Sequence, residues 1–579
     1  MSERGDVVME NIDVLVIGGG IGGVFAAIRA KQAGADRVVQ VDKARVGKSG
    51  ASCFAAGVMH VMFPTYDSLE DRVRRAVRTS GYLGQQDLIE DHFERSWPIT
   101  LEMEKYGVKF LKTPDGEIHR QQARGSHPVV MFGGPQLMDA LSKAALKMNI
   151  ARVNRVMITD LLIHEGRVVG AVGFHTRTGE FHVFKARATV LATGSTRFKA
   201  SVMEGDRTGD GFAAAFRVGA TLMGAEAHEG LTNAMLARHP IGPGMNMYVG
   251  EGARFINAKG ERFMELYNPT LKERSGLRFI AYAFSMEVRR GNAPIYNDMT
   301  HFAPEQVRKL KTVLPLAMRM YERIGIVEGD RFVNPIEWAL VPDKGRPGPA
   351  VNRNYETSLP GFYAVGEAAA SQAVITGISA AATSGAVAGE AAASYAQEIA
   401  PPGVDQDQVQ QLREYALAPL HRDRGIEPSQ IVLAMQEAIL PYDRCILRHG
   451  SRMSDALAKL ENIQKNELPL LMAYDPHYLR MAHEARNLLF TAQIYMRSSL
   501  MRTESRVALR EDYPEQDDIN WLKWIKIARD GEDMKLTTED VPIDTYTIRP
   551  ERKKELHSMW KMALQRGIIT LEGGQVKWA

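Results

Sequence analysis

The sequence predicts an α/β fold: a discontinuous parallel-sheet domain, interrupted by an inserted α+β domain and followed by a C-terminal helical domain. Three observations lead to this class. A short apolar run near the start ends in closely spaced glycines. Strand-like segments recur at residues 151–159, 168–172, 180–184, 188–194 and 361–367, and amphipathic helical stretches dominate beyond residue 403. Buried strands that alternate with helices favour a parallel sheet covered by helices.

The opening motif is a glycine-rich loop between a strand and a helix. Residues 13–17 run into Gly18-x-Gly20-x-x-Gly23, with Gly22 in the same loop, and an alanine-rich segment follows. The first glycine allows a tight turn, the second lets the backbone approach a pyrophosphate, and the third lets the helix pack on the strand. The start of the helix offers unpaired N–H groups to phosphates. The loop therefore predicts a Rossmann-like unit that binds a dinucleotide.

A second apolar segment, residues 37–41, leads to Asp42, which follows Gly23 by 19 positions. An acidic residue at the end of the second strand can accept hydrogen bonds from the adenosine ribose hydroxyls. A lone glycine fingerprint is a weak signal, but strand, loop, helix and acid in this order are specific. The sequence contains no second glycine fingerprint for a nicotinamide cofactor.

The chain of 579 residues is too long for one ordinary core, so we expect roughly two to four domains. Pro401-Pro402-Gly403 marks one boundary. The expected segments are the first part of the sheet domain at 1–223, the inserted capping domain at 224–349, the second part of the sheet domain at 350–400, a helical domain at 401–510 and an extension at 511–579. Three tryptophans of the last segment, Trp521, Trp524 and Trp560, are expected to lie over the helices.

Composition restricts the class of protein. A hydrophobic content of 45%, a charged content of 24% and a net charge of +3 describe a globular protein and give no argument for a nucleic-acid partner. The only cysteines, Cys53 and Cys445, cannot hold an iron–sulfur cluster or build a disulfide framework by themselves. We expect no metal site, and because the N-terminus lacks an apolar signal core, we expect a cytoplasmic location.

The uncharged stretch 368–389 could be mistaken for a membrane span. It consists mostly of Ala, Ser, Thr and Gly, which is too weakly apolar to favour lipid. We therefore expect a closely packed helix that runs against the cofactor, and no transmembrane segment.

Three more motifs agree with the opening loop. Ala192-Thr193-Gly194 ends an apolar strand, residues 205–211 form a glycine-bracketed turn with Asp210, and residues 361–367 end in Gly366-Glu367. In this order and spacing the chain resembles the flavoprotein subunits of the succinate dehydrogenase and fumarate reductase superfamily, which includes L-aspartate oxidase and the adenylylsulfate reductase alpha subunit. Residues 250–264 resemble the entry to its capping domain, and residues 502–521 resemble its C-terminal signature. The sequences of the loops at 236–243 and 382–385 resemble adenylylsulfate reductase more than the dicarboxylate enzymes.

The resemblance implies an FAD-dependent oxidoreductase. The FAD-contacting residues it implies are Gly18, Gly20, Gly22, Gly23, Asp42, Lys43, Ser49, Gly50, Ala51, Ala56, Gly57, Ala192, Thr193, Gly194, Asp210, Gly366, Glu367 and Ser384. For Asp210 a helix cap is the alternative, and for Glu367 a surface loop acid. The histidine that attaches FAD covalently in many relatives falls at Gly50, and His60 is a poor substitute, so we expect FAD to be bound without a covalent bond.

The resemblance breaks down at the substrate. The family's substrate histidine falls near Leu231, its proton-donor arginine at Leu277 and a second arginine near Ile378, while the active-site histidine of adenylylsulfate reductase falls at Ala380. A buried carboxylate without a cationic partner costs several kcal/mol. Fumarate, succinate and aspartate are therefore not expected as substrates.

Four residues remain as catalytic candidates. Arg278 stands next to the proton-donor position, and His239 precedes a proline in the insertion, where it is either an acid or a structural histidine. Lys344 and Arg346 lie in a Pro/Gly-rich loop that either holds an anionic group or is exposed.

These features predict a flavoprotein subunit that performs a two-electron reduction or dehydrogenation of a small anionic substrate. Without nicotinamide or cluster ligands of its own, the chain is expected to exchange electrons with a small ferredoxin-like iron–sulfur subunit. Two alternatives stay open: an electron-relay flavoprotein of a larger redox complex, and an FAD oxidase of the L-aspartate oxidase type.

Overall fold

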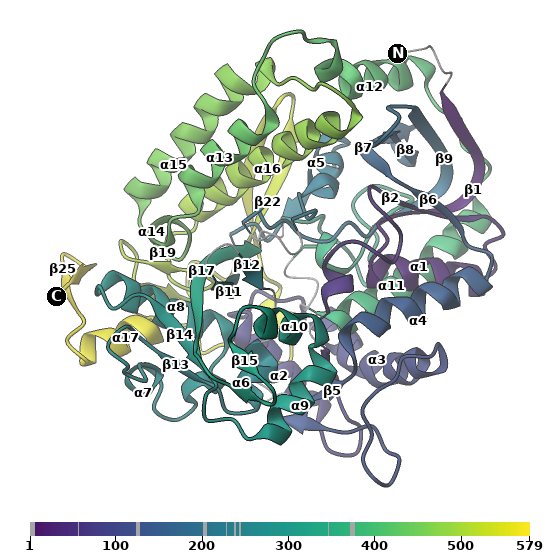
Figure 1. Ribbon diagram of the computed structural model, residues 1–579. Helices are drawn as coiled ribbons and strands as arrows, with labels where there is room; N and C mark the ends of the chain where they lie inside the picture. Colours follow the sequence, from purple (N-terminus) through teal and green to yellow (C-terminus); the bar gives the residue numbers. More distant parts are fainter. Residues whose placement is uncertain are drawn as a thin grey trace.

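The structure, a computed structural model, describes residues 6–55, 57–122, 128–200, 205–226, 229–236, 239–241, 245–344, 347–370 and 377–579 (Figure 1). Within these ranges only the backbone is described for residues 122, 229–236, 239–241, 245–246 and 339–344. Ala56 and Arg346 lie outside the described residues, as do the side chains of His239 and Lys344. The roles predicted for these four residues stay predictions.

The largest sheet has seven strands in the order β6-β2-β1-β9-β8-β7, with β18 paired to β9. The strands β6, β2, β1, β9 and β18 run parallel, whereas β7 and β8 form antiparallel pairs. The strand segments expected from the sequence fall on this sheet and confirm its class. Its strands are β1 (Val7–Ile17), β2 (Val38–Asp42), β6 (Ala151–Asn154), β7 (Val156–His164), β8 (Arg167–His175), β9 (Phe181–Leu191) and β18 (Phe362–Ala364).

Two helices with small residues pack closely beside this sheet, α1 (Ile21–Gln32) and α11 (Ile378–Glu398). A Cβ atom on Gly385 would lie 2.3 Å from the carbonyl oxygen of Gly22, and one on Gly389 would lie 2.3 Å from that of Ala26. From Ile378 onward the uncharged stretch is therefore a close-packed helix, as predicted. No helix in the described part of the chain combines the length and apolar character needed to cross a bilayer.

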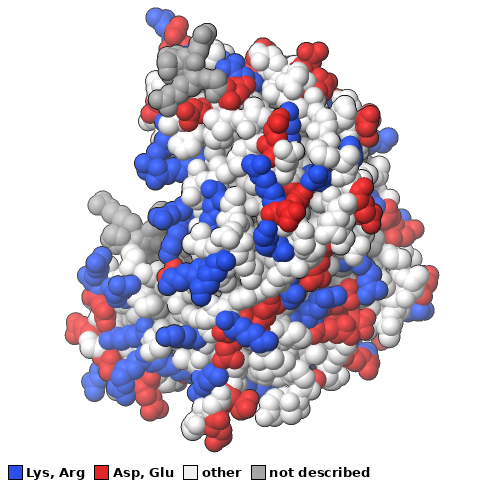
Figure 2. Space-filling model, turned by 90° about the vertical axis from the view of Figure 1, so that its right-hand side faces the viewer, with Lys and Arg blue, Asp and Glu red and all other residues white. Residues whose placement is uncertain are grey.

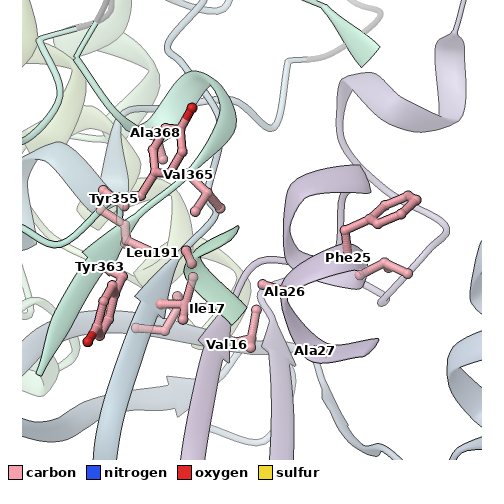
Figure 3. Packing of buried hydrophobic residues seen from close by; sticks show 14 of the residues in the cluster. Val16, Ile17, Phe25, Ala26, Ala27, Leu191, Tyr355, Tyr363, Val365 and Ala368 are labelled. Atoms are coloured by element: carbon pink, nitrogen blue, oxygen red, sulfur yellow. The ribbon is translucent and has the colours of Figure 1, made fainter. Parts of the chain in front are cut away.

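The core beneath the glycine loop joins β1, β9, β18 and α1. Figure 3 shows Val16 and Ile17 of β1 beside Leu191 of β9, with Val365 above them and Ala26 of α1 alongside. All five residues are buried. This packing fixes the ends of the parallel strands, where the predicted cofactor residues follow.

The inserted region has its own antiparallel sheet, with the strand order β12-β11-β17-β14-β13. A separate hydrophobic cluster that includes Phe255, Phe284 and Trp338 lies under it. The strands are β11 (Glu229–Leu236), β12 (His239–Ile241), β13 (Arg254–Ile256), β14 (Ile295–Asp298) and β17 (Ile336–Lys344). The main helices of the region are α8 (Leu277–Arg289), α9 (Pro304–Val313) and α10 (Pro315–Arg323).

The remaining helices complete the molecule. Three of the C-terminal ones group at the upper left of Figure 1: α13 (Pro428–Ile439), α15 (Gly450–Asn462) and α16 (Pro476–Met501). Helix α12 (Gln406–Leu417) lies at the top of the figure, near the N-terminus. Helix α16 also contacts α5 of the first part of the chain. The other helices are α2 (Leu69–Thr79), α3 (Gln86–Lys105), α4 (Gly134–Lys147), α5 (Asp210–Arg217) and α17 (Ser558–Gln565).

Two of the three tryptophans of the tail, Trp524 and Trp560, do not lie over these helices, so the prediction was wrong for them. Trp524, on β22 (Lys523–Asp530), packs with Leu83 and Met223, and its indole N–H donates to the Leu83 carbonyl at 2.7 Å. Trp560 is buried in the hydrophobic cluster of the inserted region and donates to Ser505 Oγ at 3.2 Å. Large indoles need both an apolar site and a hydrogen-bond acceptor, and both lie against the insertion and the α2–α3 connection.

Candidate functional site

The carboxyl ends of four parallel strands meet at one edge of the main sheet. Strand β1 lies between β2 and β9, so the chain leaves β1 toward one side of the sheet and later returns on the other. In open parallel sheets this switch point forms a crevice that binds ligands. The strand ends lead into Gly18, Asp42, Ala192 and Gly366.

A cavity of about 930 Å³ lies at this edge. Fourteen of the residues predicted to contact FAD line its wall, which brings together parts of the chain more than 300 residues apart. They are Gly18, Gly20, Gly22, Asp42, Lys43, Ser49, Gly50, Ala51, Ala192, Thr193, Gly194, Asp210, Gly366 and Glu367.

Three described residues of the prediction stand behind the wall instead. Gly23 and Gly57 allow close packing. A Cβ atom on Gly23 would lie 2.2 Å from the Gly18 carbonyl oxygen, and one on Gly57 would lie 2.3 Å from the Val313 side chain. The Ser384 hydroxyl donates to the Ala380 carbonyl at 2.7 Å and accepts from the Gly366 N–H at 3.0 Å. It therefore holds the Gly366 turn and does not line the cavity.

The glycine loop has the shape that a pyrophosphate requires. Gly18 has φ +119°, and a Cβ atom there would lie 2.3 Å from the Ala192 carbonyl oxygen. Helix α1 begins at Ile21 without a side-chain cap on Gly20, although the Ile21 N–H donates to Ser52 Oγ at 3.1 Å. The positive end of the helix dipole thus faces the cavity, where it favours phosphate. The residues present fit FAD at this end.

Asp42 organises the turns around the cavity. Its Oδ2 accepts from the Gly19 N–H at 2.8 Å, and its Oδ1 accepts from the Ala44 N–H at 2.7 Å and from Ser49 Oγ at 3.0 Å. Burial raises the pKa of this carboxyl, an effect that these hydrogen bonds only partly offset. Asp42 therefore fixes the glycine loop and the Ser49 turn while one side of it lines the cavity.

Lys43 lies in a buried network that the sequence did not indicate. Its ammonium pairs with Asp210 at 2.8 Å and with Glu484 of α16 at 3.0 Å, and it donates to Thr208 Oγ1 at 2.7 Å. Asp210 also accepts from Asn487 Nδ2 at 2.9 Å. The carboxylate of Asp210 is thus held by side chains, and Gly209 at the start of α5 has no side-chain cap. The helix-cap role that the sequence left open for Asp210 is therefore not what the structure shows.

Glu367 lies within the cavity wall and not on an exposed loop. Its side chain is 16% exposed, and its Oε2 accepts from Arg207 at 2.8 Å and from Ser195 Oγ at 2.7 Å. Arg207, itself 4% exposed, was missed by the sequence reasoning because the glycines and Asp210 of its motif carried the whole interpretation. This pair joins the end of β18 to the turn before α5.

The position of the covalent histidine carries no side chain. The Gly50 N–H donates to Asp206 Oδ2 at 2.8 Å, and a Cβ atom on Gly50 would meet nothing within 4 Å. His60, which we considered a poor substitute, nevertheless lines the same cavity. His92 lines it too, with Nδ1 3.0 Å from Thr383 Oγ1, and burial lowers its pKa to about 4.

The far end of the cavity is formed by α2 and by the start of α8. Arg278 lines it and donates from Nη1 to the Thr79 carbonyl at 3.3 Å. Of the four catalytic candidates it is the only one whose side chain is described. Arg72, Arg75 and Arg78 of α2 also line the cavity, and the sequence reasoning missed all three because a charged helix usually indicates a solvated face.

Comparison with protein families shows to which family this chain belongs. A model of the FAD-binding domain matches residues 13–379, which is more than half of the chain. A second model, the C-terminal part of the fumarate reductase flavoprotein, matches residues 434–555. The chain belongs to the succinate dehydrogenase and fumarate reductase flavoprotein family. This result confirms the predicted resemblance and the predicted cofactor FAD.

Curated relatives match this family member over most of their length. An uncharacterised FAD-dependent oxidoreductase of Methanocaldococcus jannaschii is 27% identical over 528 residues, which cover 87% of this chain and 94% of the relative. One of the subunits of the fumarate reductase (CoM/CoB) of Methanothermobacter marburgensis is 27% identical over 552 residues, which cover 89% of this chain and 97% of the relative. The chain is accordingly an FAD-dependent oxidoreductase.

Solved structures share the fold. The quinol–fumarate reductase flavoprotein of E. coli superposes with a TM-score of 0.84 at 23% identity, covering 94% of this chain and 99% of that chain. Adenylylsulfate reductase of Archaeoglobus fulgidus superposes with a TM-score of 0.79 at 23% identity, covering 95% of this chain and 98% of that chain. Both branches named by the resemblance thus have the architecture of this flavoprotein.

Proposed function

We propose that this chain is the flavoprotein subunit of a redox assembly that performs a two-electron reduction or dehydrogenation of a small anionic substrate. The observation that carries the proposal is the shared cavity: Arg278 lines the same space as the glycine loop at Gly18–Gly22. FAD, when bound, supplies the two-electron chemistry. The chain's own contribution is to position the substrate and to hold positive charge beside it.

The residues assigned to FAD divide by chemistry. The glycine loop and the start of α1 hold the pyrophosphate, and Asp42 with its hydrogen-bonded turn faces the adenosine ribose. Asp210 and Glu367 accept from hydroxyls of the ribose or ribityl chain. Because Gly50 has no side chain to attach the flavin, the binding is proposed to be non-covalent.

The substrate is proposed to differ from fumarate and succinate. Leu277 and Ile378, the two positions where the resemblance expects arginines, both line the cavity as apolar side chains. Two buried carboxylates would lack their partners at these positions, at a cost of several kcal/mol. Arg278 is left to hold the substrate or to donate a proton to it.

A small ferredoxin-like iron–sulfur subunit is the proposed electron partner. Its support is the name of the Methanothermobacter relative, which is one subunit of a larger enzyme. We propose the cytoplasm as the compartment, since Cys53 and Cys445 are both free thiols. The five-part domain division, with a capping domain at 224–349, is part of the same proposal.

The test is to isolate the chain from its native source with its co-purifying proteins, and to measure FAD, iron and acid-labile sulfide. The dithionite-reduced complex is then mixed with fumarate and, separately, with ferricyanide as a positive control for flavin oxidation. We expect fumarate to reoxidise the flavin no faster than buffer does. Rapid reoxidation by fumarate would overturn the substrate assignment, and stoichiometric peroxide formation from dioxygen would instead support the oxidase alternative. Isolation without iron, with a flavin edge covered by another protein, would support the electron-relay alternative.

A further inference from the structure

A second, smaller cavity borders the large one at Lys43 and Asp206. Its volume is about 330 Å³, which is at the lower end of the range for pockets that bind small ligands. Lys43 and Asp206 line both cavities, so the two spaces are direct neighbours. The smaller cavity has no role in the function proposed above.

This second cavity brings together arginines from four separate segments. Arg45 follows β2, and Arg155 joins β6 to β7. Arg177 lies in the turn between β8 and β9, and Arg480 lies near the start of α16. The fold therefore gathers guanidinium groups that are far apart in the sequence around one space.

Backbone hydrogen bonds fix three of these segments relative to one another. The Arg155 N–H donates to the Ala44 carbonyl at 2.8 Å, and the Thr176 N–H donates to the Arg155 carbonyl at 2.7 Å. Arg155 has φ +64°, in the left-handed region that glycine and asparagine adopt more readily than arginine. The turn itself thus gives no reason for an arginine at this position.

Three of the four arginines have no charged partner among the described residues. No ion pair and no side-chain hydrogen bond of Arg45, Arg155 or Arg177 is formed within the described part of the chain, although all three line the cavity. Arg480 differs, because it pairs with Glu484 at 2.5 Å. The first three arginines are therefore the ones available to a ligand.

The acidic charge at the cavity is too small to balance them. Asp206 is the one acid among the described lining residues, and its Oδ2 already accepts from the Gly50 N–H at 2.8 Å. On the face that Figure 2 shows, by contrast, Lys and Arg are intermingled with Asp and Glu, so opposite charges lie close together there. Like charges that converge on one space repel one another unless an anion joins them.

The second cavity also offers almost no apolar surface. Ala44 is the only hydrophobic residue among its described lining residues, and His477 supplies the only ring. The large cavity is instead lined by apolar side chains that include Val156, Met157 and Leu161. A flavin or adenine ring therefore suits the large cavity, whereas the second one suits a compact and highly charged group.

We propose that Arg45, Arg155 and Arg177 form a binding site for a phosphate-type oxygen polyanion, distinct from the sites of FAD and of the substrate. Planar guanidinium forks bind phosphate oxygens through paired hydrogen bonds, and three forks from separate segments match an anion with several such oxygens. The ligand is either free pyrophosphate or the diphosphate of a nucleotide whose base lies outside the cavity. The inference does not depend on which reaction the flavin performs.

The test is a calorimetric titration of the FAD-loaded full chain with pyrophosphate, ADP and acetate at constant ionic strength. We expect pyrophosphate to bind at least tenfold more tightly than acetate and to leave FAD bound. Arg155→Asn and Arg177→Gln should each raise the Kd of pyrophosphate at least tenfold. Asparagine tolerates the left-handed backbone, so Arg155→Asn removes the charge and keeps the turn. Arg37→Gln is the control, since Arg37 is exposed just before β2, at the opposite end of that strand from Arg45, and should leave the Kd within twofold.

Thermal unfolding and FAD content are measured for every variant, so that loss of binding is not confused with loss of folding. Tighter binding of ADP than of pyrophosphate identifies a nucleotide as the ligand, and equal or weaker binding identifies the free anion. The inference is overturned if pyrophosphate binds no more tightly than acetate, or if it displaces FAD. It is also overturned if Arg155→Asn and Arg177→Gln both behave like Arg37→Gln, which is the result expected if the anion binds elsewhere, such as between α2 and α8.

Discussion

The ammonium group of Lys43 lies 3.0 Å from the carboxylate of Glu484, a residue 441 positions further along the chain. Glu484 is fully buried and also accepts from Lys199 at 2.7 Å and from Arg480 at 2.5 Å. One carboxylate thus pairs with three cations and ties α16 to the end of β2. The helical domain thereby takes part in building the wall of the cavity.

Replacing Glu484 by Gln should destabilise the fold strongly, because Lys199 and Arg480 lose their buried counter-ion and Lys43 keeps only Asp210. Removing one partner of a buried ion pair typically costs about 3–5 kcal/mol. The free energy of unfolding, measured in urea, should fall by that amount. Glu461→Gln is the matched control, since Glu461 pairs with Arg497 while 46% exposed and should contribute about 1 kcal/mol or less. Equal urea midpoints for the two variants would contradict the expectation.

The same carboxylate predicts a pH dependence. Burial acts to raise the pKa of Glu484, but attraction to Lys43, Lys199 and Arg480 lowers it to about 2 from an ordinary 4.5. The folded state therefore binds this proton less readily than the unfolded state, so the stabilisation is complete above pH 4.5 and is lost as the pH falls toward 2. The thermal midpoint of the natural chain should drop across this window. In Glu484→Gln the drop should be smaller, and parallel curves would refute the assignment.

His92 predicts acid sensitivity at a higher pH. Burial lowers its pKa from 6.5 to about 4, so the folded chain keeps it neutral where the unfolded chain binds a proton. Stability is complete above pH 6.5 and is lost as the pH falls toward 4, by about 3 kcal/mol for a shift of this size. His92→Gln should reduce the fall of the thermal midpoint between these two pH values, and the fall that remains is expected from His483 and His557, whose pKa values burial also lowers to about 4. The exposed His477, replaced in the same way, should leave the natural profile unchanged.

The sequence was sufficient for the parts of the site that are local in the chain. Gly18, Gly20 and Asp42 stand at fixed distances along one strand–loop–helix–strand unit, so their spacing alone placed them at the cavity. The fold class and the cofactor could be predicted for this reason.

The sequence was insufficient where the site depends on packing between distant segments. Glu484 lies in a long helix without any motif, and only the docking of α16 on α5 brings it to Lys43. Arg75 and Arg78 belong to a helix rich in charge, and nothing in that pattern indicates that they line the cavity. Ser384 was predicted to contact FAD, but Ala381 of the same helix lines the cavity instead. The Ser384 hydroxyl lies behind the cavity wall, where it accepts from the Gly366 N–H.

Non-covalent binding of FAD predicts that acid releases the flavin. When the purified protein is precipitated with trichloroacetic acid, the yellow colour and flavin fluorescence should stay in the supernatant. Flavin retained on the precipitated chain would contradict this, and His60→Ala would then be the variant to examine, since His60 lines the cavity. Release of the flavin from that variant alone would identify His60 as the point of attachment.

Gly18 offers the sharpest test of the glycine loop. In Gly18→Ala the new Cβ atom would lie 2.3 Å from the Ala192 carbonyl oxygen, on a backbone with φ +119°. Loop and strand must move apart, so the pyrophosphate site is lost, and we expect the FAD content to fall more than tenfold. Overpacking of this kind also costs about 1–3 kcal/mol of stability.

Gly219→Ala separates the clash from backbone strain. Gly219 has φ +95°, but a Cβ atom there meets nothing within 4 Å. Its replacement should cost about 1 kcal/mol through the unfavourable backbone conformation alone and leave the FAD content unchanged. FAD content is read from the absorbance of the released flavin, and unfolding is followed in urea. If Gly18→Ala keeps its FAD, or if both variants lose it equally, contact between the Gly18 turn and β9 does not shape the cofactor site.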